Sequence, residues 1–160
     1  MTPPFENAAD FVAALPAHVP LLGLDFGDKT IGVALCDAHW TIATPRETIK
    51  RNKFSVDATA LEVIIDETRA KGLILGLPRN MNGTEGPRCQ KTRAFARNFA
   101  LRRDLPVLLW DERLSTVAAE RALLEADTSR EKRAKVIDHV AAGYILQGAL
   151  DRFTHIKRKY

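Results

Sequence analysis

This sequence of 160 residues has little cysteine and no long hydrophobic run, and both absences narrow what the protein can be. Its two cysteines, Cys36 and Cys89, form neither a CxxC pair nor a zinc-binding pattern, which is typical of a protein in a reducing cytosol. No apolar run approaches the roughly 18 residues of a membrane span. The N-terminus lacks the basic region of a signal peptide. We therefore expect a cytoplasmic protein without a membrane partner.

The sequence also lacks internal repeats, low-complexity segments and an interdomain linker. Its length fits one domain with a sizeable core, and 46% hydrophobic with 28% charged residues is an ordinary globular composition. We expect a helical extension over 1–18, one main domain over 19–152 and a basic, frayed tail over 153–160. The net charge of +4 suits a polyanionic partner, although many basic proteins bind nothing anionic.

Short apolar runs separated by turns, followed by helical patterns, predict the order of elements. Strands are predicted at 21–26, 31–36, 41–50, 72–78 and 105–110. Helices are predicted from Ser55 to Ala70, from Pro87, from Ser115/Thr116 to Glu125, and from Thr128-Ser-Arg-Glu131 onward. Short turns join the first three strands in an antiparallel meander, and crossover helices make the last two parallel. This is a mixed five-stranded sheet flanked by helices, the ribonuclease H-like arrangement.

Asp25 stands inside the first apolar strand, where a lone charge is costly unless something compensates it. A bound metal ion is one such compensation, and a half-buried carboxylate bonded to the Gly27-Asp28 turn is the structural alternative. The nearby glycines do not make a dinucleotide-binding fingerprint, because no helix follows this turn.

A second acidic site, Asp111-Glu112, directly follows the strand predicted at 105–110. Ligands of open α/β sheets bind at the carboxyl ends of parallel strands. Because adjacent residues on an extended segment point in opposite directions, only one of the two carboxylates is expected to face Asp25. We favour Glu112 and keep Asp111 as a candidate; the other one would pair with Arg113 or cap the next helix.

Asp138 begins an alanine-rich face of the last predicted helix. Positions 141, 142, 145 and 149 continue that face, so we expect it to point toward the sheet; a salt bridge to Lys135 or Arg113 is the alternative. Three converging carboxylates would repel one another unless a cation lies between them. Oxygen ligands suit Mg²⁺ or Mn²⁺, and one or two such ions would support phosphodiester cleavage.

Polar and basic residues around this acidic site suggest an interface for nucleic acid. The predicted strand at 72–78 is followed by a loop, Pro78–Gly86, whose side chains and backbone amides could contact phosphate. Basic residues lie in the first turn of the meander, in the helix after Pro87 and in the segment before Asp138. The alternative for each of them is an ordinary solvated surface residue. The candidate contact residues are Lys29, Asn80, Asn82, Thr84, Arg88, Arg113, Arg130, Arg133 and Lys135.

Four sequence blocks resemble one known family, the YqgF/RuvX group of Holliday junction resolvase-like proteins, which are also described as pre-16S rRNA nucleases. They are Gly23-Leu-Asp-Phe-Gly-Asp-Lys-Thr-Ile-Gly-Val-Ala34, Gly76-Leu-Pro-Arg-Asn-Met-Asn-Gly-Thr-Glu-Gly86, Trp110-Asp-Glu-Arg-Leu-Ser-Thr116 and Ile137-Asp-His-Val-Ala-Ala-Gly-Tyr-Ile-Leu-Gln147. The blocks occur in family order. Ser115 replaces the family's usual threonine and Asn82 a common aspartate, and neither change removes a proposed ligand.

The resemblance implies a ribonuclease H-like nuclease that uses Asp25, the Asp111/Glu112 pair and Asp138 with Mg²⁺ or Mn²⁺. It favours processing of pre-16S rRNA ends in a bacterial cytoplasm. Resolution of branched DNA and non-catalytic binding of nucleic acid stay open as alternative functions. A monomer and a homodimer both stay open as the oligomeric state. A sugar-kinase or chaperone-type ATPase fits less well, because those proteins enclose nucleotide between two such domains.

Overall fold

The computed structural model describes residues 3–114 and 130–157, with side chains described over 3–114 and 140–156. The strands are β1 Leu22–Phe26, β2 Thr30–Cys36, β3 Ala43–Lys50, β4 Leu73–Leu77 and β5 Val107–Asp111. The helices are α1 Ala8–Ala13, α2 Phe54–Thr68, α3 Pro87–Arg102, the 3₁₀ helix η1 Glu112–Leu114, and α5 Arg130–Lys157.

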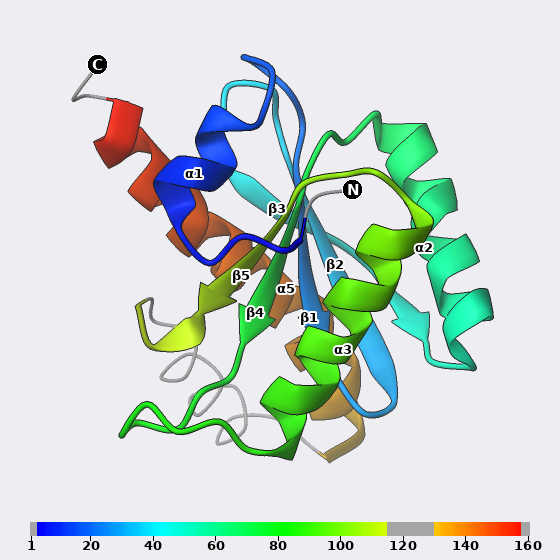
Figure 1. The fold of residues 1–160 in the computed structure, drawn as a ribbon. Coiled ribbons are helices and arrows are strands. Elements are labelled where there is room, and N and C mark those ends of the chain that lie inside the picture. The colour runs from blue at the N-terminus through cyan, green and yellow to red at the C-terminus, as the bar shows by residue number, and fades with distance from the viewer. Residues whose placement is uncertain (1–2, 115–129, 158–160) are drawn as a thin grey trace.

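The described strands form one five-stranded sheet in the order β3-β2-β1-β4-β5 (Figure 1). β1 pairs with β2 and β2 with β3 in antiparallel fashion, whereas β1 with β4 and β4 with β5 are parallel. The predicted mixed sheet is therefore confirmed. Because β1, β4 and β5 run the same way, their carboxyl ends meet at one sheet edge.

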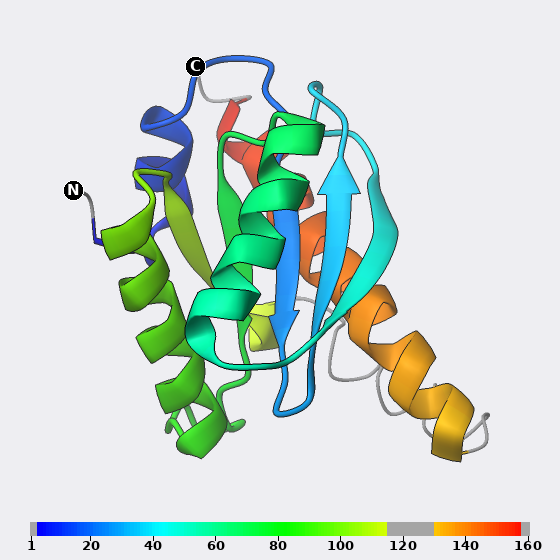
Figure 2. The same ribbon diagram turned by 90° about the vertical axis from the view of Figure 1, so that its right-hand side faces the viewer.

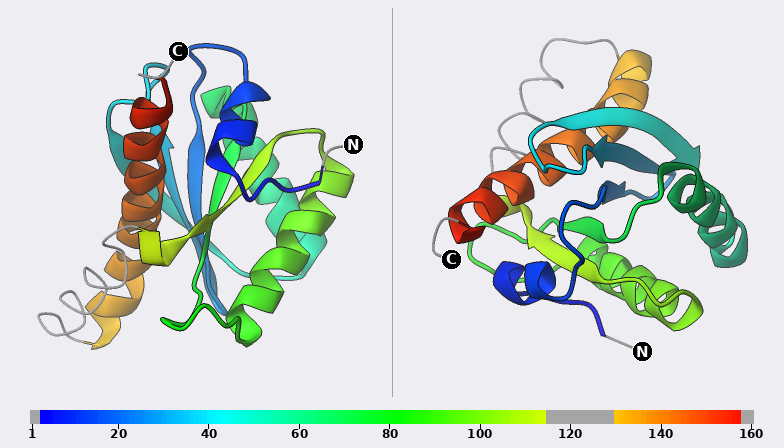
Figure 3. Two further views of the ribbon diagram at one scale, coloured as in Figure 1. Left: turned by 60° about the vertical axis from the view of Figure 1, so that its left-hand side comes forward. Right: turned by 90° about the horizontal axis from the view of Figure 1, so that it is seen from above.

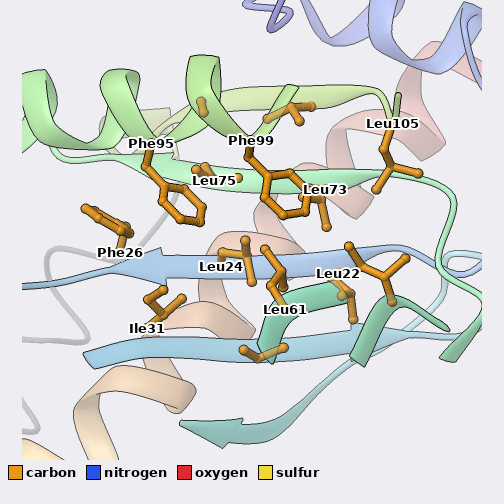
Figure 4. Close-up of a cluster of buried hydrophobic side chains, with 14 of the residues drawn as sticks. Leu22, Leu24, Phe26, Ile31, Leu61, Leu73, Leu75, Phe95, Phe99 and Leu105 are labelled. Carbon is orange, nitrogen blue, oxygen red and sulfur yellow. The ribbon is translucent and has the colours of Figure 1, made fainter. Parts of the chain in front are cut away.

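Helices cover both faces of the sheet (Figure 3). On one face, α2 and α3 bury a core in which Leu61 and Phe99 pack against Leu24 and Leu75 (Figure 4). On the other face, α5 and α1 bury a second core that includes Phe11 and Phe153. Alternate residues of β2, β4 and β5 therefore face different cores, as the twofold repeat of a strand requires.

The α5 helix approaches β1 closely because Gly23 has no side chain. A Cβ atom built on Gly23 would lie 2.6 Å from the Leu146 Cβ and 2.9 Å from the Ala142 carbonyl oxygen. Any larger residue at this position would push the helix away from the sheet. Figure 2 shows that α5 begins near the edge toward which β1 points, so its first turns lie beside the carboxyl ends of the parallel strands.

Two local predictions are wrong. The predicted cap Ser55 lies inside α2, whose N-cap residue is Lys53 without a side-chain capping bond. The predicted basic tail is helical through Lys157 as part of α5. Phe153 is fully buried and its ring lies 5.8 Å from that of Phe11, so apolar packing extends the helix beyond the basic pattern.

Other parts of the prediction are confirmed or lie outside the described region. Pro87 opens α3, and Cys36 is a buried core residue whose pKa burial raises to about 11. The predicted helix from Ser115/Thr116 to Glu125 and the capping residue Thr128 lie outside the described residues. Within the described part of the chain, every helix is too short or too polar to cross a membrane.

Candidate active site

Asp25 lies near the carboxyl end of β1, the central strand, on the sheet face that α5 covers. Its neighbours Leu24 and Phe26 belong to the core under α2 and α3, so the strand alternation turns Asp25 to the opposite face. Its side chain is only 3% exposed. Leu24 is level with Leu75 of β4, so the next pair of residues along the two parallel strands is Asp25 and Gly76.

Gly76 provides the space into which the Glu112 carboxylate reaches. A Cβ atom built on Gly76 would lie 2.8 Å from Glu112 Oε1, and it would also meet the Ile145 side chain of α5. Glu112 begins η1 directly after β5 and is 7% exposed. The carboxylates of Asp25 and Glu112 are therefore both buried on the face of the sheet that α5 covers. Gly76 belongs to β4, which lies between β1 with Asp25 and β5, the strand that Glu112 follows.

Asp111 has different surroundings from Glu112. Its carboxylate accepts a hydrogen bond of 2.7 Å from Arg113 Nη2, and Arg79 Nη1 lies 3.9 Å away. Burial by itself would raise the pKa of Asp111, but the hydrogen bonds and charge of Arg113, aided by Arg79, lower it overall. Of the two adjacent carboxylates, Asp111 is thus the one that pairs with Arg113.

The third predicted acidic residue, Asp138, lies in α5, and its side chain is outside the described residues. The same is true of Arg130, Arg133 and Lys135. Over residues 3–114 and 140–156, no group of three or more histidine, cysteine, aspartate or glutamate side chains is placed to hold a metal ion. The described part of the site therefore contributes a pair of buried carboxylates.

The loop after β4 is held together by its own polar residues. The Asn80 N–H donates to the Thr84 carbonyl oxygen at 2.9 Å, and the Gly83 N–H donates to that of Asn80 at 2.8 Å. The Thr84 hydroxyl donates to Asn82 Oδ1 at 2.6 Å. Gly83 has a φ of +87°, which a residue with a side chain rarely adopts. The candidate residues Asn80, Asn82 and Thr84 thus form a compact turn at the carboxyl edge.

Arg113 connects this loop to the end of β5. Its Nη1 donates to the Met81 carbonyl oxygen at 3.3 Å, while its other contacts hold Asp111. The remaining described candidates, Lys29 in the β1–β2 turn and Arg88 in the first turn of α3, are exposed. Lys29, the loop and Arg113 all follow the carboxyl ends of β1, β4 and β5.

An ion-pair cluster beside the loop was not anticipated from the sequence. Glu85 accepts two hydrogen bonds of 2.7 Å from Arg93, and Arg93 also donates to Glu6 at 2.8 Å. Arg79 lies 3.3 Å from Glu85. These residues come from separate parts of the chain, and no local spacing pattern connects Glu6 to Arg93, so sequence reasoning had no signal for their meeting.

Comparisons with known proteins identify the family of this chain. The sequence model of the family described as "RuvX: Holliday junction resolvase" matches residues 19–152. A protein of Roseobacter denitrificans named "Putative pre-16S rRNA nuclease" is 64% identical over 154 residues, which cover 95% of this chain and 94% of that protein. A protein of the same name from Ruegeria sp. strain TM1040 is 66% identical over 148 residues, with 92% and 94% covered.

A solved structure shares the fold at low sequence identity. Thermus thermophilus RuvC in complex with a Holliday junction substrate superposes with a TM-score of 0.56 at 11% identity, covering 86% of this chain and 96% of that one. At this identity the likeness shows the ribonuclease H-like fold alone. The match of the family model over most of the chain and the high identity of the curated relatives carry the assignment. The chain therefore belongs to the RuvX family of Holliday junction resolvases, enzymes that hydrolyse phosphodiester bonds in nucleic acid.

Proposed function

We propose that this protein is a metal-dependent nuclease that trims the ends of pre-16S rRNA during ribosome biogenesis. The observation that carries the proposal is the pair of buried carboxylates, Asp25 and Glu112, beside Gly76, whose lack of a side chain leaves room for the Glu112 carboxylate. The names of relatives that are 64% and 66% identical favour the rRNA precursor as substrate. Relatives of this kind come from bacteria, so we place the activity in a bacterial cytoplasm.

The residues present fit Mg²⁺ or Mn²⁺, because carboxylate oxygens are the ligands these ions prefer. Asp25 and Glu112 would hold the ion from the sheet. Position 138 lies seven residues before Ile145 in α5, close to two helical turns, and Ile145 lies over Gly76. Asp138 would therefore be the ligand from the helix side. One or two bound ions would supply an activated water and stabilise the leaving oxygen of a phosphodiester.

The surrounding residues would bind and orient the substrate backbone. Arg113 and the loop Asn80–Thr84 lie at the carboxyl edge next to Glu112, where their donors would hold phosphate groups. Asp111 would keep the Arg113 guanidinium in place through its hydrogen bonds. The further basic residues proposed to follow the backbone are Lys29, Arg88, Arg130, Arg133 and Lys135.

The test is cleavage of two labelled substrates, a pre-16S rRNA fragment and a four-way DNA junction, by the wild type and Asp25→Asn with Mg²⁺ or Mn²⁺. We expect the wild type to cut the rRNA fragment and Asp25→Asn to lose at least about a thousandfold in rate, because one of the carboxylates that would hold the ion is lost. Folding and substrate binding should be retained. Unaltered cleavage by Asp25→Asn would refute the site.

Resolution of branched DNA is the second candidate function, and the description of the matched family favours it. Cutting of the four-way junction but not of the rRNA fragment would establish this function instead. Such an enzyme should act as a homodimer, because two symmetric strands must be cut, whereas an rRNA-trimming enzyme needs only a monomer. Binding without any cleavage would identify a non-catalytic nucleic-acid-binding protein.

A further inference from the structure

The N-terminal segment is attached to the domain along β5, the edge strand next to β4. The Phe5 N–H donates to the Val107 carbonyl oxygen at 2.7 Å, and the Leu109 N–H donates to that of Phe5 at 2.8 Å. This bridge continues the sheet by one residue beyond the edge strand β5. The Phe5 ring also packs edge-on against the fully buried Phe11. The backbone next to Glu6 is therefore fixed on both sides by the body of the protein.

From this anchored position, the Glu6 carboxylate reaches the loop through arginines. Glu6 Oε1 lies 2.8 Å from Arg93 Nη2 and 3.5 Å from Arg79 Nη2. Arg93 holds both carboxylate oxygens of Glu85, the residue that ends the loop before α3. Arg79 begins the loop and also lies 3.3 Å from Glu85. Both ends of the loop are thus tied to the same N-terminal carboxylate.

The same cluster continues toward the candidate active site. Arg79 Nη1 lies 3.9 Å from Asp111 Oδ2, and Asp111 holds Arg113, which donates to the Met81 carbonyl oxygen. Met81 is the middle of the loop, and Glu112 follows Asp111 directly. A chain of charged contacts therefore runs from the N-terminal segment around the loop to the residue beside the buried carboxylate.

Within this cluster, the contact between Arg93 and Glu85 is more protected from solvent than an ordinary surface ion pair. The side chains of Arg93 and Glu85 are 23% and 22% exposed, and their contact is bidentate. An exposed pair stabilises little because water screens it, whereas a bidentate pair with low exposure also fixes geometry. The hydrogen bond from Arg93 is the main reason that the pKa of Glu85 is lowered. The contact is therefore suited to hold the loop in one conformation.

We propose that Glu6 is a positioning residue for the loop 78–86, so that the N-terminal segment sets the affinity of the enzyme for its substrate. The proposal rests on the proposed function only in taking the loop as a substrate-binding element. The segment lies outside the residues that the family model matches. It acts through Arg93 and Arg79, and Glu6 itself need not touch nucleic acid.

The first test follows the loop without any substrate. Hydrogen exchange of the Asn80, Gly83 and Thr84 amides is measured in the wild type, Glu6→Gln and Glu67→Gln. Glu67 is the matched control, because it is 57% exposed against 56% for Glu6 and lies 2.9 Å from Arg46, away from the loop. We expect these amides to exchange about threefold to tenfold faster in Glu6→Gln, and to be unchanged in Glu67→Gln.

The second test separates binding from chemistry on the pre-16S rRNA fragment. Glu6→Gln should raise KM about threefold to tenfold with kcat little changed, since the loop orients substrate but does not react. Glu6→Asp, which keeps the charge, should restore part of the affinity. Unchanged loop exchange in a folded Glu6→Gln protein would overturn the proposal. Faster exchange with no nuclease activity in the wild type would instead refute the proposed function and leave the positioning role standing.

Discussion

Two adjacent acidic residues at the end of β5 have opposite surroundings. Asp111 is held by Arg113 and Arg79, and its pKa is lowered because these contacts outweigh the effect of burial. Glu112 is more buried and its Oε1 fills the space over Gly76, on the side of the sheet that α5 covers. This contrast assigns different tasks to the two residues: Asp111 would orient Arg113, and Glu112 would bind metal.

Metal affinity distinguishes these two tasks. We expect Glu112→Gln to weaken Mn²⁺ binding at least about tenfold, because loss of a supporting residue alone often costs that much and loss of a ligand costs more. Asp111→Asn should bind Mn²⁺ almost normally, since its amide oxygen can still accept from Arg113. Calorimetric titration of each protein with Mn²⁺ measures both affinities. The reverse ranking would identify Asp111 as the ligand.

A second residue-scale prediction concerns Asp37, which ties the turn after β2. Its carboxylate accepts backbone N–H groups from Thr41 at 2.9 Å and from His39 at 3.1 Å. The Thr41 hydrogen bond is the main reason that the pKa of Asp37 lies below its ordinary value of 3.8. A lowered pKa in the folded state stabilises the fold above that ordinary value, and the stabilisation is lost as the pH falls through the folded-state pKa.

Asp37→Ala should therefore be less stable than the wild type at pH 6, and the difference should shrink as the pH falls below about 3.8. Urea unfolding of both proteins at several pH values between 6 and about 3 measures it. A difference that stays constant over this range would show that the contribution of Asp37 does not depend on its charge.

At the scale of elements, two glycines decide how closely α5 approaches the sheet. Gly23 faces Leu146 and the Ala142 carbonyl oxygen, and Gly76 faces Ile145 and Glu112. A close approach brings the first turns of α5, which contain Asp138, to the carboxyl edge where Asp25 and Glu112 lie. The site is therefore assembled by helix packing as much as by the acidic residues themselves.

Gly76→Ala tests this dependence. The added methyl group would overlap Ile145 and lie 2.8 Å from Glu112 Oε1, so we expect a loss of about 1–3 kcal/mol in the free energy of unfolding and weaker Mn²⁺ binding. Gly86→Ala is the matched control, because a Cβ atom there meets nothing within 4 Å and the φ of −90° suits alanine. Denaturant unfolding and metal titration of both variants give the comparison. Equal behaviour of the two would refute the close-packing argument.

The elements themselves were largely predictable from sequence, whereas their long-range contacts were not. The apolar runs around Asp25 and before Pro78 predicted β1 and β4, because buried strands need little more than apolar residues between turns. The end of α5 was missed because Phe153 is buried against residues distant in sequence, Phe11 and Trp40, and the basic residues around it suggested a frayed tail. The Glu6–Arg93 contact was invisible for the same reason.

For the molecule as a whole, the count of 24 lysines and arginines overstates how much positive charge is available to nucleic acid. Several cations in α3 or directly after it are already paired with carboxylates: Lys91 with Asp28, Arg102 with Glu62, and Arg103 with Asp66. Within the described region, Lys29 and Arg88 are exposed and have no ion-pair partner. These two cations lie at the carboxyl edge beside the candidate site, so we expect both to release counterions on binding.

The salt dependence of substrate binding measures this distribution. The logarithm of the association constant falls linearly with the logarithm of salt concentration, with a slope of about 0.7–0.9 for each phosphate contacted. We expect Lys29→Ala and Arg88→Ala each to lower that slope by about one. Arg103→Ala should leave it nearly unchanged, because Asp66 holds the Arg103 guanidinium at 2.7 Å. Anisotropy titrations of a labelled RNA at several salt concentrations give the slopes. An equal loss in all three variants would mean that the substrate contacts extend from the carboxyl edge along the whole of α3.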